Sequence, residues 1–205
     1  MTDLILYTHP MSRGRIARWM LEETGAAYTT SIVPFNEMKG AEYRTINPMG
    51  KVPALKHKQH IITETAAICA YLADTFPDAK LSPTTDERAD YYRWLFFGAG
   101  PVEAAISNHA IGFNPTEEQS RFVGYGSYET VMDVLDQTLS AKPYITGSRF
   151  TAADVYIGAQ INFGLGFKTI DARPSFLAYS ERLKERAALQ RATALDEADM
   201  AKVKT

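Results

Sequence analysis

Two short stretches carry the residues with the clearest potential for binding chemistry. Residues 47–55 read Asn-Pro-Met-Gly-Lys-Val-Pro-Ala-Leu, and residues 64–68 read Glu-Thr-Ala-Ala-Ile. The first stretch predicts a turn and then a short buried strand with Pro53 at its start, where no ladder donor is needed. An X-Pro bond can be cis at modest cost, and a cis bond turns backbone groups sideways into a cleft.

The second stretch predicts the start of a helix at Glu64-Thr65, because apolar helix formers follow without a breaker. A helix start presents free N–H groups and the positive end of the helix dipole, which favour a carboxylate ligand. A strand edge that offers backbone pairing therefore lies close to an anion-binding helix terminus. This combination is suited to a small peptide ligand. The simpler alternative is that Glu64 and Thr65 only cap the helix.

The order Gly-Lys-Val-Pro-Ala-Leu and then Glu-Thr-Ala-Ala-Ile resembles the glutathione-binding core of the cytosolic glutathione transferase superfamily, as a bacterial-type member. The resemblance implies that Glu64 meets the ammonium of the γ-glutamyl end of glutathione and that Thr65 donates to its α-carboxylate. It also implies that Val52 pairs its backbone with the cysteinyl unit beside cis Pro53, and that Lys51 meets the glycyl carboxylate.

A transferase of this kind must also stabilise the thiolate of glutathione. A free thiol has a pKa of about 8.5, so it is mostly protonated at neutral pH. Each unit by which the protein lowers that pKa requires about 1.4 kcal/mol of preferential thiolate stabilisation. A helix N-terminus and a hydroxyl donor can supply this together.

The family places its activating Tyr, Ser or Cys just after the first strand, where this chain reads Tyr-Thr-His-Pro-Met-Ser-Arg over residues 7–13. Ser12 is the first candidate, because it has a hydroxyl and lies at a predicted helix start; its other possible role is a plain N-cap. Tyr7 is the second candidate, although its place in an apolar strand favours the core. Thr8 and His9 are weaker candidates. Arg13 stands near where some bacterial members carry Cys, so cysteine chemistry is not supported.

The electrophile site is expected to face the helical domain. Aromatic residues at helical spacing are usually core residues, so no one of them is a strong candidate alone. Met11 would neighbour the reacting sulfur if Ser12 is the activator. The candidates retained for this site are Met11, His109 and Phe113, with Phe97, Phe163 and Phe167 as further aromatic possibilities.

The elements that position these residues follow a simple order. Short apolar runs and a helical pattern predict βαβ, a short helix, and then ββα over residues 1–77; the resemblance supports a thioredoxin-like α/β domain. Residues 78–86 predict a linker, and residues 87–205 predict an all-α C-terminal domain. Within it we expect a kink at Pro101, a helix over residues 117–139 capped by Thr116, and a helix that begins with the capping box Thr151-x-x-Asp154.

Composition sets the outer bounds. The 205 residues are 45% hydrophobic and 22% charged, with a net charge of −2, which is ordinary for a globular protein. This charge gives no overall attraction to nucleic acid or membranes, and the four His lack zinc-ligand spacing. Cys69 is the single cysteine, so no internal disulfide forms. No secretory signal or spanning run is evident, so we expect a cytoplasmic protein.

These observations predict a glutathione transferase that conjugates glutathione, its co-substrate, to a hydrophobic electrophile without a metal. The resemblance implies a homodimer. Two alternatives stay open: a glutathione-dependent isomerase or disulfide reductase on the same fold, and a non-catalytic interaction module.

Overall fold

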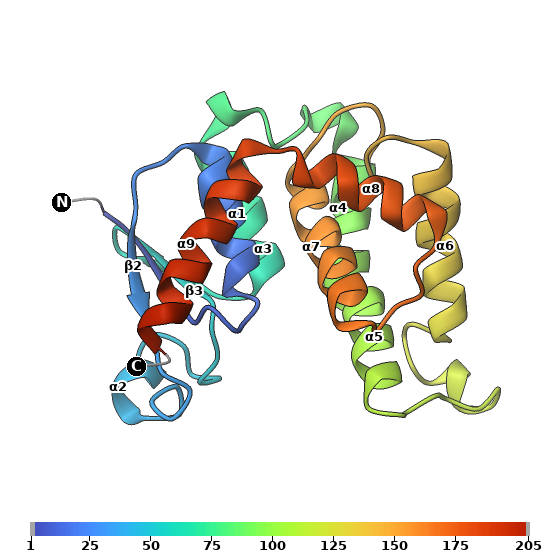
Figure 1. Cartoon of the computed structure of the whole chain (residues 1–205), viewed down its shortest axis with the longest axis horizontal. Coiled ribbons are helices and arrows are strands. Elements are labelled where there is room, and N and C mark those ends of the chain that lie inside the picture. Colours follow the sequence, from blue (N-terminus) through green and yellow to red (C-terminus); the bar gives the residue numbers. More distant parts are fainter. Residues whose placement is uncertain (1–2, 204–205) are drawn as a thin grey trace. The chain divides into compact units, whose positions relative to one another are not determined.

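The computed structural model describes residues 3–203, and the chain divides into two compact units (Figure 1). Unit 1 comprises Met1–Leu81 together with Lys184–Thr205, and unit 2 comprises Ser82–Leu183.

Unit 1 is built on a four-stranded mixed sheet with the order β2-β1-β3-β4. β1 pairs in parallel with β2 and antiparallel with β3, and β3 pairs antiparallel with β4. Alternate residues of β1 point to opposite faces of the sheet, so Leu4 and Leu6 are buried on one face while Tyr7 points to the other. The strands are β1 (Leu4–Thr8), β2 (Thr29–Ile32), β3 (Ala54–His57) and β4 (His60–Ile62).

Three helices complete the predicted βαβ-α-ββα order: α1 (Gly14–Thr24), α2 (Ala41–Arg44) and α3 (Thr65–Thr75). α1 and α3 pack against each other beside the sheet (Figure 1). α1 has a pronounced apolar face, as a helix on a sheet requires; its buried residues include Ile16, Trp19, Met20 and Leu21. The order of elements predicted from the sequence is therefore confirmed.

The last helix, α9 (Ala187–Val203), lies along α1 and belongs to unit 1 (Figure 1). The sequence had placed this segment with the helical domain over residues 87–205. The packing differs because α1 carries a buried cation that α9 neutralises: Arg18 forms ion pairs with Asp196 at 3.0 Å and Asp199 at 2.6 Å. The boundaries 1–77, 78–86 and 87–205 stay a prediction about folding units.

Unit 2 is helical throughout its regular structure. α7 is buried along most of its length, as expected for the central helix of its unit. The predicted interruption at Pro101 is present as a π-helical turn, Gly98–Val102, between α4 and α5. The helices are α4 (Arg88–Phe97), α5 (Glu103–Ala110), α6 (Tyr128–Ala141), α7 (Ala152–Phe167) and α8 (Pro174–Lys184).

The helix predicted over residues 117–139 is wrong in its first half, because α6 begins only at Tyr128. Thr116 and Gln119 do form the reciprocal capping bonds, but these bonds precede a single 3-10 turn, Gln119–Arg121. Gly126 then has a φ of 72°, in the left-handed region, which ends the turn. Ser127 accepts the N–H of Thr130 and starts α6 anew.

The capping box at the start of α7 is confirmed. Asp154 is fully buried and accepts from the N–H and the hydroxyl of Thr151, from the N–H of Ile145 and from the hydroxyl of Tyr179. Four donors therefore satisfy a carboxylate that burial would otherwise make very costly. This motif organises unit 2 and carries no chemistry.

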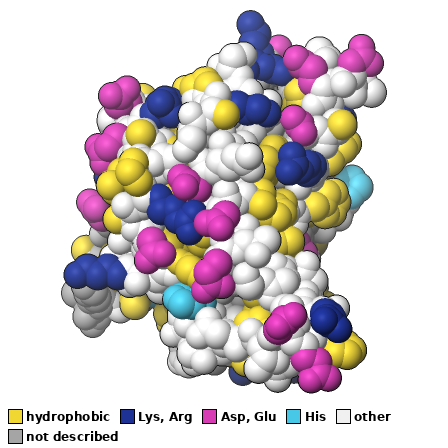
Figure 2. All heavy atoms as spheres, turned by 90° about the vertical axis from the view of Figure 1, so that its right-hand side faces the viewer, with side chains coloured by type: hydrophobic (Ala, Val, Ile, Leu, Met, Phe, Trp, Pro, Cys, Tyr) yellow, Lys and Arg dark blue, Asp and Glu magenta, His cyan; other side chains and the backbone are white. Residues whose placement is uncertain are grey.

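Figure 2 shows basic and acidic side chains interspersed over one face of the molecule. Unit 2 also has ion pairs at its surface, for example Arg173 with Asp133 at 2.7 Å. Among the described residues, no helix is long and apolar enough to cross a membrane.

Candidate functional site

Three segments of unit 1 meet at one edge of its sheet. β1 and β3 are antiparallel with Tyr7 opposite Ala54, so the loop after β1 leaves the sheet beside the residues that precede β3. β4 is antiparallel to β3 with Ile62 opposite Leu55, so β4 also ends at this edge, and α3 begins three residues later. The sheet topology thus brings together the loop before α1, the segment before β3 and the start of α3.

The Val52–Pro53 peptide bond is cis, as the motif predicts. Pro53 is buried and Val52 is half-buried, and β3 begins only at Ala54. Within residues 3–203, no hydrogen bond joins the backbone of Val52 to the rest of the chain. The N–H and C=O of Val52 therefore remain available to pair with an extended peptide.

Two residues that the sequence reasoning missed hold the preceding turn. The Lys51 carbonyl accepts from the hydroxyl of Tyr43 at 2.8 Å and from Nδ2 of Asn47 at 2.6 Å. Burial raises the pKa of Tyr43 to about 12, so its hydroxyl keeps its proton and donates. Asn47 also accepts the N–H of Met49, which is an Asx turn. The Asn-Pro pair in the sequence was the available signal for this turn.

Gly50 is required in the same turn. Its φ is 62°, and a Cβ atom there would lie 2.7 Å from the carbonyl oxygen of Met38. A side chain at this position would therefore be strained and would also push the backbone apart.

Glu64 and Thr65 form the start of α3. The backbone of Glu64 is strained, because its φ is 64° and its ψ is 115°. Its side chain makes no cap hydrogen bond, so the carboxylate does not cap the helix. The first N–H to bond back is that of Ile68, to the Glu64 carbonyl. The N–H groups at the beginning of α3 are therefore free of intrahelical partners, which is the arrangement that binds a carboxylate.

Ser12 lies in the loop before α1, but the helix begins at Gly14 and Arg13 occupies the N-cap position. The prediction that Ser12 is the N-cap is therefore displaced by one residue, within the usual uncertainty of helix ends. The Ser12 hydroxyl donates to the His9 carbonyl at 2.6 Å and accepts the N–H of Gly14 at 3.0 Å. To donate to a ligand, this hydroxyl must rotate away from His9.

His9 organises this loop. Its Nδ1 accepts the N–H of Met11 at 3.1 Å, so the neutral ring carries its proton on Nε2. The ring is buried and stacks on Phe35 with 3.9 Å between ring centroids. Burial lowers the pKa of His9, which keeps the ring neutral at neutral pH. His9 therefore holds the backbone N–H of Met11 through its ring and the side-chain hydroxyl of Ser12 through its carbonyl.

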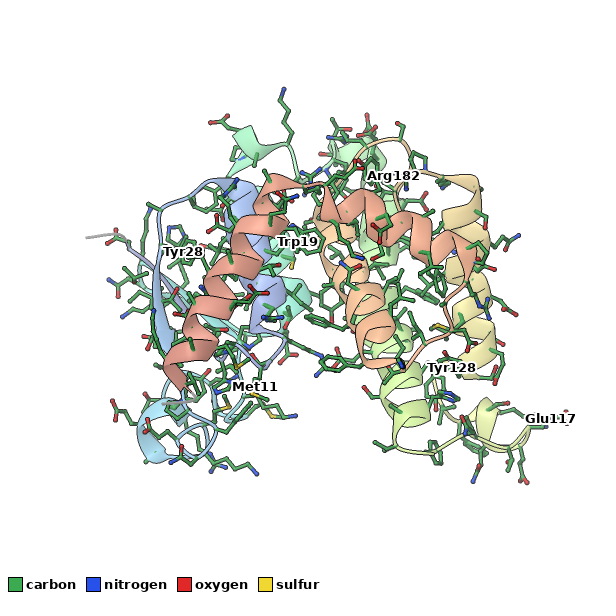
Figure 3. The ribbon with its side chains drawn as sticks, in the orientation of Figure 1. Met11, Trp19, Tyr28, Glu117, Tyr128 and Arg182 are labelled. Carbon is green, nitrogen blue, oxygen red and sulfur yellow. The ribbon has the colours of Figure 1, made fainter. Side chains whose placement is uncertain are left out.

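The other candidates of the loop have different surroundings. Thr8 is fully buried, and its Oγ1 would lie 1.8 Å from a Cβ atom at position 14, so it packs under the first turn of α1. Tyr7 points to the other face, where its ring lies 6.2 Å from that of Tyr43, which agrees with a packing role. Met11 is 62% exposed beside the start of α1 (Figure 3).

The two candidates from unit 2 lie at the end of α5 and in the loop after it. The ring of His109 stacks on Tyr128 at 4.0 Å, and its Nδ1 bonds Oδ1 of Asn114 at 2.8 Å. Phe113 is 41% exposed. His109 thus has packing partners within its own unit, and Phe113 has an accessible ring. Cys69 is buried in α3, and burial raises the pKa of its thiol, so it is an inert core residue.

Comparisons with known proteins agree on one family. Residues 11–75 match the family model "Glutathione S-transferase, N-terminal domain". The chain is 30% identical over 190 residues to the glutathione S-transferase-like protein OpS6 of Beauveria bassiana, covering 85% of this chain and 87% of that protein. It is 28% identical over 182 residues to the glutathione S-transferase GstA of Escherichia coli O157:H7, covering 83% and 87%.

Solved structures agree with the sequence relatives. A glutathione transferase from Methylococcus capsulatus superposes with a TM-score of 0.80 at 28% identity, over 95% of this chain and 99% of that one. A glutathione transferase homologue from Sulfitobacter, solved with bound glutathione, gives 0.75 at 26% identity over 95% and 98%. The predicted fold, a thioredoxin-like domain with a helical C-terminal domain, is confirmed. The chain belongs to the glutathione S-transferase family.

Proposed function

We propose that this protein binds glutathione at the sheet edge of unit 1, stabilises its thiolate and transfers it to a hydrophobic electrophile. The observation that carries the proposal is the convergence of three segments at that edge: the unpaired backbone of Val52, the free N-terminus of α3 and the hydroxyl-bearing loop before α1. Each segment offers a group that glutathione needs. These are a backbone that can pair with the extended peptide, a site for its carboxylate, and a hydroxyl that can donate a hydrogen bond to its thiolate.

In this proposal Val52, beside Pro53, pairs with the cysteinyl unit through its N–H and C=O. The start of α3 receives the γ-glutamyl end: Thr65 donates to the α-carboxylate and Glu64 meets the ammonium. Lys51 meets the glycyl carboxylate. The uncapped carboxylate of Glu64 and its strained backbone support this assignment, because strain of this kind persists at ligand sites.

The thiolate is stabilised by Ser12 and by the positive end of α1. When the hydroxyl leaves the His9 carbonyl and donates to sulfur, it exchanges a neutral hydrogen bond for a stronger charge-assisted one. The helix dipole adds favourable potential. The thiolate then attacks the electrophilic carbon and expels its leaving group, which completes the conjugation.

The electrophile contacts proposed are Met11, His109 and Phe113, as the sequence suggested. The exposure of Met11 and Phe113 supports them, since both offer apolar surface to solvent. His109 has internal partners and is the weakest of the three. A homodimer in the cytoplasm is proposed on the family resemblance alone.

The test combines binding and turnover. Calorimetry should detect glutathione binding, and 1-chloro-2,4-dinitrobenzene should be conjugated in its presence, with both signals reduced at least tenfold in Thr65→Ala. Turnover of a glutathione mixed disulfide or an isomerisable substrate without conjugation would favour the reductase or isomerase alternative. Binding without any turnover would favour the non-catalytic module, and no binding would refute the proposal.

A further inference from the structure

A second concave site lies in unit 1, on the face of the sheet to which Tyr7 points. It is a cavity of about 410 Å³ between β1, β2, the segment after β2 and α2. This volume lies in the range of small-molecule pockets in proteins. Neither the segment before β3 from Lys51 to Pro53 nor the start of α3 lines it, so its lining differs from that of the proposed glutathione site. The two sites are neighbours, because Tyr43 lines the cavity and also donates to the Lys51 carbonyl.

One part of the cavity lining is aromatic and aliphatic, and the rest is polar. Tyr7 and Tyr43 contribute rings whose centroids lie 6.2 Å apart with planes tilted by 55°. Val33 and Ile46 add aliphatic surface and pack in the same cluster. The Tyr43 ring is fixed, because its hydroxyl donates to the Lys51 carbonyl. One of the two aromatic rings that line the cavity is therefore held in place by a hydrogen bond.

The charge of the cavity has one sign. Glu37 and Glu42 both line it and both are exposed. Among the described residues that line it, none is Lys, Arg or His. The two glutamates disfavour an anion here, although Ser31 and Asn36 also line the cavity with groups that can donate hydrogen bonds. A cation gains both from the carboxylates and from the negative faces of the aromatic rings.

We propose that this cavity binds a small organic cation with an apolar body, such as an alkylated ammonium compound. The apolar body packs on Val33 and Ile46, the ammonium group lies against Tyr7 and Tyr43, and the two glutamates supply opposite charge. Glutathione, with two carboxylates, does not fit this chemistry. The inference rests on the cavity itself and holds whether or not the chain is an active transferase.

The test compares choline with 3,3-dimethyl-1-butanol, a neutral molecule of the same shape, by NMR titration of the full chain. Choline is expected to shift the amide signals of residues 31–46 in a saturable way, with an affinity roughly fivefold or more above that of the neutral alcohol. Glu37→Gln/Glu42→Gln should remove most of that preference and leave the binding of the alcohol unchanged.

The matched control is Glu117→Gln/Glu118→Gln, which removes two exposed acidic charges from a loop of unit 2. Its affinity for choline should equal that of the wild type. Equal affinities for choline and the alcohol, shifts that map outside residues 31–46, or the same loss in both double variants would each overturn the proposal. Glutathione binding, measured in the same samples, reports separately on the other site.

Discussion

Glu64 combines a strained backbone with a proposed role in glutathione binding. A glutamate at φ 64° and ψ 115° occupies a conformation that costs about 1–3 kcal/mol. Glu64→Gly relieves this strain, but glycine also gives the unfolded chain more conformational freedom, which opposes the gain. We therefore expect the variant's free energy of unfolding to be equal to that of the wild type or up to about 2 kcal/mol higher. The same variant should bind glutathione at least tenfold more weakly, because the ammonium loses its partner.

Urea unfolding and calorimetry on the same samples check this expectation, with Glu64→Ala as the control. Alanine removes the carboxylate and keeps the backbone strain, so it should lose affinity without gaining stability. Full affinity in both variants would mean that Glu64 does not contact the ligand.

His9 predicts a pH dependence of stability. Burial lowers its pKa in the folded state below the ordinary value of 6.5. Its contribution to stability is therefore complete above pH 6.5 and is lost as the pH falls through the folded-state pKa, because the unfolded chain takes up the proton first. His9→Asn can still accept the Met11 N–H but cannot titrate.

The difference in unfolding free energy between wild type and His9→Asn should accordingly shrink as the pH is lowered from 7 toward 5. Chemical unfolding at several pH values measures it. A difference that does not change with pH would show that His9 titrates alike in both states.

At this scale the sequence predicts chemistry better than it predicts orientation. The types and spacing of Val52, Pro53, Glu64 and Thr65 predict one site, and the sheet topology brings their segments together. Their contacts with glutathione stay a prediction. The sequence could not show that Tyr7 points away from α1. Alternation along a strand places neighbouring residues on opposite faces of the sheet, but it does not tell which face the helix covers. The sequence also could not show that the Ser12 hydroxyl already donates a hydrogen bond to the backbone carbonyl of His9.

Among the elements, α9 depends on charges buried against α1. Arg18 is 2% exposed between Asp196 and Asp199. Burial raises the pKa of Asp196 to about 6, although Arg18 and Arg15 favour its ionised form. At pH 7 Asp196 is therefore largely ionised, and its charge requires the guanidinium.

We expect Arg18→Met to destabilise the protein by about 3 kcal/mol at pH 7, because it removes the fully buried cation between Asp196 and Asp199. Arg15, at 3.7 Å from Asp196, and the exposed Lys202, at 2.8 Å from Asp199, replace this cation only in part. Arg191→Met is the matched control: Arg191 pairs with Glu22 at 2.9 Å but is 55% exposed, so its loss should cost less than about 1 kcal/mol. Denaturant unfolding of both variants decides. Equal and small losses would show that the buried pairs contribute little.

The elements themselves were largely predictable, since apolar periodicity and capping residues are local signals. The prediction of one helix over residues 117–139 is wrong because the apolar stripe continues across Gly124 and Gly126, although the chain turns there and α6 begins only at Tyr128. The position of α9 could not be predicted, because it depends on ion pairs between residues at opposite ends of the chain.

For the whole molecule, the two units are not two consecutive stretches of sequence. Deleting residues 187–205 should therefore weaken unit 1, not the helical unit that precedes the deletion in sequence. Amide hydrogen exchange is expected to accelerate in α1, where Arg18 loses its partners, while α6 and α7 keep their protection. Faster exchange in α6 and α7 with an unchanged α1 would contradict this division.

The central claim is that the sheet edge of unit 1 binds glutathione and lowers the pKa of its thiol. The most direct measurement is the ultraviolet absorbance of the bound thiolate as a function of pH, for wild type and Ser12→Ala. We predict a pKa below the free value of about 8.5 in the wild type, raised by roughly one unit in the variant, as expected for the loss of one charge-assisted hydrogen bond. An equal lowering in both proteins would transfer the role from Ser12 to backbone amides, and a wild type that lowers the pKa of no bound thiol would contradict the account.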